Sequence, residues 1–170
     1  MKKQQGFSLI ELLIVVAIIL IIAAIAIPNL LRSKIAANES SAVGSVRTIG
    51  TAEVTYSSSW GVGFAPDLVS LGGAAPCVNA SAATACLIDP LLSVAPFTKS
   101  GYVFDAKGTL VNGGINNGFE VNATPAAYQT TGVRAFCDDQ VGVIKQDPSG
   151  TKFGTGDNVC ANSAMTPVGN

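Results

Sequence analysis

An apolar segment near the amino end constrains the fold of this chain more than any other feature. From Leu12 to Ile27, sixteen consecutive residues carry no polar side chain, and the stretch from Leu12 to Leu31 carries no charge. As a helix rising about 1.5 Å per residue, that stretch reaches about 30 Å, the thickness of the hydrocarbon core of a bilayer. Lys2 and Lys3 precede it, and positive flanks stay in the cytoplasm. The segment therefore predicts one membrane-crossing helix whose amino end starts inside.

The rest of the composition favours a small exported domain over an enzyme or a nucleic-acid binder. The 170 residues suffice for one ordinary domain with an appendage. The charged fraction is 12%, the net charge is -1, and no basic cluster follows the first residues, so we expect no direct nucleic-acid binding. Histidine is absent, which removes the commonest general base and metal ligand. We therefore expect no catalytic residues, no cofactor and no metal.

Two details of the first residues do not fit an ordinary signal or anchor. Glu11 places a carboxylate at the entrance of the apolar run, where a lone charge needs a partner. A secretory signal has a shorter apolar run without an acid, followed by a small-residue cleavage site. A simple single-pass anchor explains the length and the lysines, but it gives no reason for Glu11 or for the junction between Gly6 and Phe7.

The sequence MKKQQG followed by FSLIELLIVVAII resembles the class III signal of type IV pilins and related pseudopilins. This resemblance implies that a prepilin peptidase cuts between Gly6 and Phe7, so that residues 1–6 form a leader peptide. It also implies N-methylation of the new amino-terminal residue, Phe7. Cleavage removes two lysines and leaves a mildly acidic subunit.

The same resemblance suggests roles in assembly for Glu11 and Pro28. After cleavage, the ammonium of Phe7 and the carboxylate of Glu11 both lie among apolar side chains and need compensation. The resemblance implies that Glu11 pairs with the terminal ammonium of a neighbouring subunit. Pro28 predicts a kink or a local loss of helix near Ala24 to Pro28. Alternatively, Pro28 only marks the membrane boundary.

The helix is expected to run from Phe7 to Ser58. Residues 7–31 form its membrane and filament-core part, and residues 32–58 form an amphipathic extension. Its apolar stripe recurs at helical spacing and is expected to pack on a sheet. The stripe comprises Ile35, Ala42, Val46, Ile49 and Tyr56, while Arg32, Lys34, Glu39 and Arg47 are expected mostly on other faces. Gly44 and Gly50 weaken this half of the helix, so packing must compensate, and either glycine would permit a bend.

Residues 59–170 are expected to form the globular head, and the whole chain to adopt an α+β, pilin-like fold. Most of residues 57–96 should be loop, with a short helix at 87–94. Alternating apolar residues predict four strands of an antiparallel sheet, at 101–106, 119–123, 133–137 and 141–145. We expect turns at Asn112 to Gly118 and at Asp138 to Gln140, and coil after Asp147.

Four cysteines follow the apolar segment: Cys77, Cys86, Cys137 and Cys160. An even number on an exported domain predicts two disulfides, and counting allows three pairings. We favour Cys77 with Cys86 and Cys137 with Cys160, since each closes a stretch with few apolar residues. Free buried thiols and a zinc site are the disfavoured alternatives. A calcium site, as in some pseudopilins, is disfavoured because its candidates, Asp138, Asp139, Asp147 and Asp157, are not in a dense ligand loop.

The resemblance implies a structural subunit of a type IV pilus-like extracellular filament, serving motility, adhesion or DNA uptake. Its partners would be further copies in a homo-oligomeric helical filament, the prepilin peptidase, and an inner-membrane assembly platform with its ATPase. The subunit would sit in the inner membrane before assembly and at the cell surface afterwards. The main alternative is a periplasmic pseudopilin of a type II secretion system. An anchored binding module or enzyme is a further alternative.

Overall fold

The computed structural model describes residues 7–73, 76–151, 156, 159–162 and 165–168. The chain divides into two units, Met1–Lys34 and Ile35–Asn170, and the long helix α1 contributes residues to both. The leader peptide, which includes Gly6 of the expected cleavage site, lies outside the described residues, as does Asp157.

Helix α1 spans Leu9–Trp60 without interruption. Its expected limits were Phe7 and Ser58, so the prediction is confirmed to within two residues. Of the two effects expected of Pro28, a kink or a local loss of helix, the loss of helix is not observed, because Ala24 to Pro28 are all helical and Pro28 lies inside the helix. The kink stays a prediction. A proline removes one backbone N–H donor, and the long run of hydrogen bonds on either side of it keeps the helix continuous. The helix is also unbroken at the two glycines, Gly44 and Gly50.

The part of α1 in the second unit buries the expected stripe. Ala42, Val46, Ile49 and Tyr56 are buried against the sheet, and Ile35 is half-buried. The expectation for one charged residue is wrong. Glu39 lies on the buried face because an arginine from the sheet region compensates its charge. A second acid of this face, Glu53, is also buried, and the spacing of 39, 42, 46, 49, 53 and 56 shows that both acids continue the stripe.

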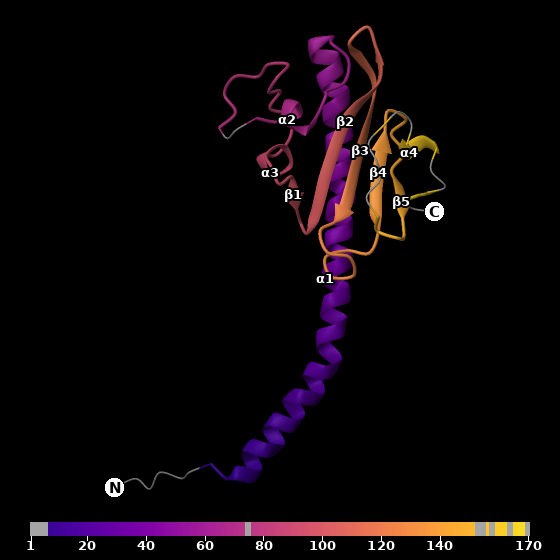
Figure 1. The fold of residues 1–170 in the computed structure, drawn as a ribbon. Helices are drawn as coiled ribbons and strands as arrows, with labels where there is room; N and C mark the ends of the chain where they lie inside the picture. Colours follow the sequence, from indigo (N-terminus) through magenta and orange to yellow (C-terminus); the bar gives the residue numbers. More distant parts are fainter. Residues whose placement is uncertain (1–6, 74–75, 152–155, 157–158, 163–164, 169–170) are drawn as a thin grey trace. The chain divides into compact units, whose positions relative to one another are not determined.

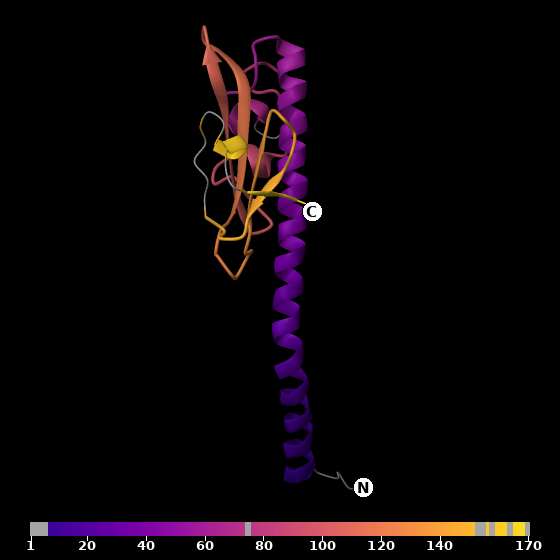
Figure 2. The ribbon, with the colours of Figure 1, turned by 90° about the vertical axis from the view of Figure 1, so that its right-hand side faces the viewer.

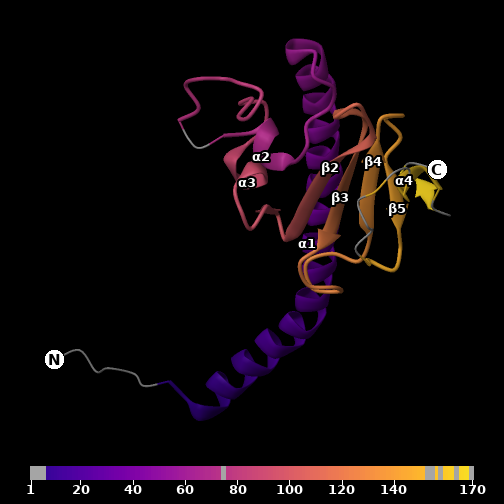
Figure 3. The same ribbon diagram turned by 45° about the horizontal axis from the view of Figure 1, so that its top comes forward.

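Within the described part of the chain, the sheet has six strands whose order across the sheet follows their order in the chain (Figures 1 and 3). Every neighbouring pair is antiparallel, as expected for a meander. The sheet lies along the part of α1 that belongs to the second unit (Figure 2). The strands are β1 (Thr98–Lys99), β2 (Tyr102–Asn112), β3 (Ile115–Pro125), β4 (Ala135–Asp139), β5 (Lys145–Asp147) and β6 (Thr166–Pro167).

The β2–β3 hairpin is longer and its turn tighter than expected. The turn expected within Asn112 to Gly118 is present but shorter, because β2 continues to Asn112 and β3 begins at Ile115. Only Gly113 and Gly114 connect the strands, with φ angles of 60° and 82°. Positive φ at both central residues is the geometry of a type I′ turn, which matches the twist of the strands, and glycine adopts it without strain.

The expected turn and strand after Cys137 are also wrong. Asp138 and Asp139 belong to β4 and are buried, so they do not form a turn. The chain reverses after them, and β5 begins only at Lys145. Val141 lies exposed in the loop between these strands. Two acids inside a buried strand contradict the usual apolar pattern, which is why alternation alone misplaced the end of β4.

Two short helices lie near the β1 edge of the sheet, α2 (Leu68–Leu71) and α3 (Pro90–Ser93) (Figure 3). Asp67 caps α2 by accepting a hydrogen bond from the backbone N–H of Ser70, and Asp89 accepts one from that of Leu91 at the start of α3. The short helix expected at residues 87–94 is therefore present but shorter. The tail beyond Asp147 is not all coil, because α4 (Val159–Asn162) and β6 lie within it.

Candidate functional site

Ser8 and Glu11 form one half of a capping box at the start of α1. The backbone N–H of Ser8 donates to the Glu11 Oε2 at 2.9 Å, and the backbone N–H of Leu12 donates to the Ser8 carbonyl at 3.2 Å. The sequence Ser-x-x-Glu favours this arrangement, in which the acid satisfies a backbone donor before the helix begins. A carboxylate is also favoured here by the positive end of the helix dipole. Glu11 therefore has a local role in helix initiation, which the sequence analysis missed although the motif was visible.

The apolar side chains that follow have no protein cover among the described residues. Every large hydrophobic side chain from Leu9 to Leu31 is exposed, with exposed fractions of 44–77%. This part of α1 is long and apolar enough to cross a membrane. Phe7, the residue expected to become the amino terminus, is 81% exposed. A continuous apolar surface of this size needs lipid or protein around it.

Buried carboxylates occupy several separate places in the second unit, and the first of them is Glu39. It accepts hydrogen bonds from the backbone N–H groups of Val133 and Arg134, and from the guanidinium of Arg134 at 2.6 and 2.9 Å. Burial alone would raise the pKa of Glu39, but these donors stabilise the carboxylate and lower the pKa. This group therefore holds the start of β4 on α1.

Glu53 is fully buried, and its Oε2 accepts a hydrogen bond from the backbone N–H of Ala65 at 2.8 Å. Burial raises the pKa of Glu53 to about 8. The hydrogen bond from Ala65 lowers this pKa, and the nearby Asp67 carboxylate raises it further. The neutral acid thus joins α1 to the loop that follows it.

Asp138 lies in the sheet face that packs on α1, beside Gly50. A β-carbon at Gly50 would lie 2.8 Å from the Asp138 Oδ2, so the glycine permits this close approach. Burial raises the pKa of Asp138 to about 6, and the Asp139 carboxylate adds to this rise. A hydrogen bond from the backbone of Asp139 and the charge of Arg47 lower the pKa and oppose it.

On the opposite face, Glu120 accepts hydrogen bonds from the backbone N–H groups of Gly156 and Cys160, which holds α4 over the sheet. Burial raises the pKa of Glu120, and these donors oppose the rise.

The cysteines form two disulfides, Cys77 with Cys86 and Cys137 with Cys160. This is the pairing that the sequence favoured. The first bond closes the loop between α2 and α3, where Cys77 is exposed. The second ties β4 to α4 and is buried at both ends.

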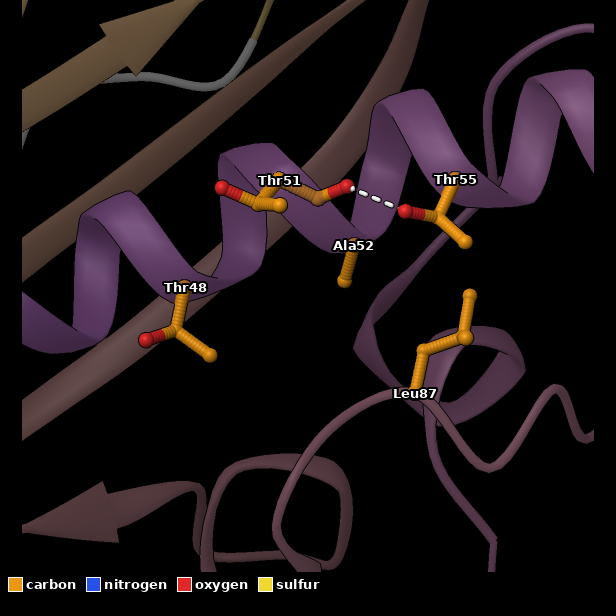
Figure 4. A pocket seen from close by; sticks show the side chains of 5 residues that line it. All are labelled: Thr48, Thr51, Ala52, Thr55 and Leu87. Atoms are coloured by element: carbon orange, nitrogen blue, oxygen red, sulfur yellow. Dashed lines mark hydrogen bonds between the residues drawn. The ribbon is translucent and has the colours of Figure 1, made fainter.

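One cavity of the second unit is lined by Thr48, Thr51, Ala52, Thr55 and Leu87 (Figure 4). Its threonine hydroxyls donate to backbone carbonyls one turn earlier in α1, as the dashed line from Thr55 shows. It contains no charged group, and the described residues contain no cluster of three or more potential metal-binding acids and cysteines.

Comparisons with known proteins agree with the amino-terminal motif. Residues 1–27 match the family model described as the prokaryotic N-terminal methylation motif. The chain is 40% identical over 73 residues to the type IV major pilin protein PilA of Myxococcus xanthus, covering 38% of this chain and 33% of that protein. It is 59% identical over 39 residues to the type IV wide pilus major component PilA4 of Thermus thermophilus, covering 23% of this chain and 30% of that protein.

No solved structure matches the chain. The matched stretches span about a third of the length of these relatives. The chain thus carries the methylation motif that its first residues predicted, and it is similar to type IV major pilins over part of its length.

Proposed function

We propose that this chain is a structural subunit of a type IV pilus-like extracellular filament. The uncovered apolar surface of α1 between Leu9 and Leu31 supports this function most directly. Before assembly the bilayer covers this surface, and in a filament the same segments of other copies cover it. Burial of apolar area and close packing then hold the polymer together.

Maturation prepares this segment for assembly. A prepilin peptidase cuts between Gly6 and Phe7, and the new amino terminus at Phe7 is methylated. The match of residues 1–27 to the methylation motif supports this step. Cleavage leaves a cationic end one residue before Ser8, whose backbone N–H already contacts Glu11.

Glu11 then pairs with the terminal ammonium of a neighbouring copy and sets the register of assembly, because a carboxylate surrounded by apolar side chains needs an opposite charge. Pro28 provides a point where the core helix lacks one hydrogen bond and can adjust its packing. An inner-membrane platform and its ATPase supply the work of extraction from the membrane.

A pilus is favoured over a secretion pseudopilus, because both similar proteins are named as major pilus components. The subunit would therefore lie in the inner membrane before assembly and at the cell surface afterwards. The cavity in Figure 4 does not support an enzymatic role, because its lining residues carry no charge.

The test is electron microscopy of material sheared from the cell surface, with mass analysis of the subunit in it. Filaments composed of a chain that begins at methylated Phe7 are expected. A chain that keeps residues 1–6 and stays in the membrane fraction as a monomer would overturn the proposal.

A further inference from the structure

The β2–β3 hairpin contains both steps of the chain in which an asparagine precedes a glycine. Asn112 and Gly113 meet at the turn, and Asn117 and Gly118 follow five residues later in β3. An asparagine before a glycine loses its side-chain amide more readily than other asparagines, because a residue without a β-carbon leaves its backbone nitrogen open to attack the neighbouring side chain. The two steps share this chemistry, so the fold decides how each of them reacts.

Asn112 lies where the hairpin is least supported. It is the last residue of β2, its side chain is exposed, and within the described part of the chain its amide makes no hydrogen bond. It pairs with Ile115, the final pair of the ladder before the two glycines of the turn. This end of the hairpin projects beyond β4 and β5 (Figures 1 and 2). Because the last pair of an exposed ladder opens most easily, the backbone at Asn112 has access to other conformations.

Asn117 is held in place by its surroundings. Its side-chain nitrogen donates to the backbone carbonyls of Leu110 and Ile115 at 3.1 and 3.3 Å. Gly118 is buried and pairs with Thr109 inside the ladder. A β-carbon at Gly118 would lie 2.8 Å from the Thr109 Oγ1, so this backbone has little room to rotate. An attack on the Asn117 side chain therefore requires the hairpin to open well beyond its final pair.

We propose that Asn112 is a site of spontaneous deamidation, and that the fold protects Asn117 from the same reaction. The backbone nitrogen of Gly113 gives up its proton and attacks the Asn112 Cγ, and the side-chain nitrogen leaves as ammonia. The resulting cyclic imide takes up one water molecule and opens to aspartate or isoaspartate. One amide and one water are consumed, and one carboxyl group and one ammonia are formed. Because the reaction needs only the chain and water, it does not depend on the proposed function.

Deamidation changes both the charge and the backbone of the turn. The product places a carboxylate beside Val111 and Ile115, which are 63% and 46% exposed. Isoaspartate also adds one methylene group to the backbone, which alters the strand pairing that a two-residue turn requires. Old copies of the chain would thus differ from new ones at the end of this hairpin.

The test follows the full chain in detergent over time at mildly alkaline pH. Residues 108–134 form one tryptic peptide, so its fragmentation compares both asparagines within the same molecule. Deamidation is read from the mass increase at each position, and isoaspartate from labelling by an isoaspartyl methyltransferase. We expect Asn112 to react about tenfold faster than Asn117 or more, because each hydrogen bond that must break slows the reaction at Asn117.

The same chain, reduced and unfolded in denaturant, is the control, and its two asparagines should react at similar rates. The variant Asn112→Gln keeps an amide but needs a larger ring for the attack, so deamidation at this position should almost disappear. Equal rates at the two asparagines of the folded chain, or faster reaction at Asn117, would overturn the proposal. A folded chain that is inert at Asn112 while the unfolded chain reacts would overturn it too. None of these outcomes depends on whether the chain forms filaments.

Discussion

The carboxylate of Glu39 in α1 accepts hydrogen bonds from both the backbone N–H and the guanidinium of Arg134, which lies 95 residues further along the chain. This contact joins the helix to the start of β4. Gln146 on β5 accepts another hydrogen bond from the same guanidinium, so one arginine connects three elements.

Glu39→Ala should therefore lower the free energy of unfolding by about 2–3 kcal/mol, because the backbone donors of residues 133 and 134 lose their acceptor. The measurement is chemical denaturation of the full chain in detergent, with the exposed neighbour Ser40→Ala as control. A variant as stable as the control would show that the contact contributes nothing.

Glu53 should make the folded head less stable as the pH rises. Its pKa is about 8 in the fold, against an ordinary value of 4.5 in the unfolded chain. Between these values the unfolded chain has released the proton and the folded chain has not. The contribution of Glu53 to stability therefore falls from pH 4.5 towards 8 and is constant above that range.

Glu53→Gln keeps an acceptor for the N–H of Ala65 and removes the titration. We expect this variant to gain on the order of a few kcal/mol relative to wild type at pH 8, and to show a flatter dependence of stability on pH. Unfolding curves from pH 5 to about 9 check this, and an unchanged slope would contradict it.

Two glycines of α1 provide a matched pair. A β-carbon at Gly50 would meet the Asp138 Oδ2 at 2.8 Å, whereas one at Gly44 would meet nothing within 4 Å. Alanine is the better helix former by about 1 kcal/mol. Gly44→Ala should therefore raise stability by up to about 1 kcal/mol, while Gly50→Ala should lower it. Thermal denaturation of both variants tests this, and the same sign for both would contradict the packing described for Asp138.

The two disulfides should differ in their access to reductant. Cys77 is exposed, whereas Cys137 and Cys160 are buried. Mild reduction followed by alkylation and mass analysis should label Cys77 and Cys86 first, because thiol exchange requires access to a sulfur. Equal labelling rates for both pairs would show that α4 does not protect the second bond.

Helix α1 was largely predictable from the sequence, because its long apolar run and the apolar stripe that follows each have one strong interpretation. The ends of the strands could not be predicted from the sequence. Asp138 and Asp139 were interpreted as a turn because acids usually avoid buried strands. The space that Gly50 leaves for the buried Asp138 side chain comes from another element of the fold, which spacing in the sequence does not reveal. Likewise, the partner of Glu39 is too distant in the chain for spacing to reveal it.

The capping role of Glu11 was visible in the sequence but was overlooked beside its proposed role in assembly. The spacing from Ser8 to Glu11 is that of a capping box, and the hydrogen bond from the Ser8 N–H to the Glu11 carboxylate is formed. Loss of the capping hydrogen bond alone would lower the stability of the helix by about 1 kcal/mol. An unpaired buried charge would destabilise the assembly by about 3–5 kcal/mol. This difference separates the two roles experimentally.

The most direct test of the account is the amount of Glu11→Ala subunit in sheared filaments, relative to wild type, in cells where mass analysis shows normal cleavage at Phe7. We expect roughly a hundredfold less of the variant subunit in filaments, or even less, because its terminal ammonium groups would lie unpaired in the core. Glu11→Ala subunits that enter filaments in wild-type amounts would contradict the claim that neighbouring copies neutralise each other in the core.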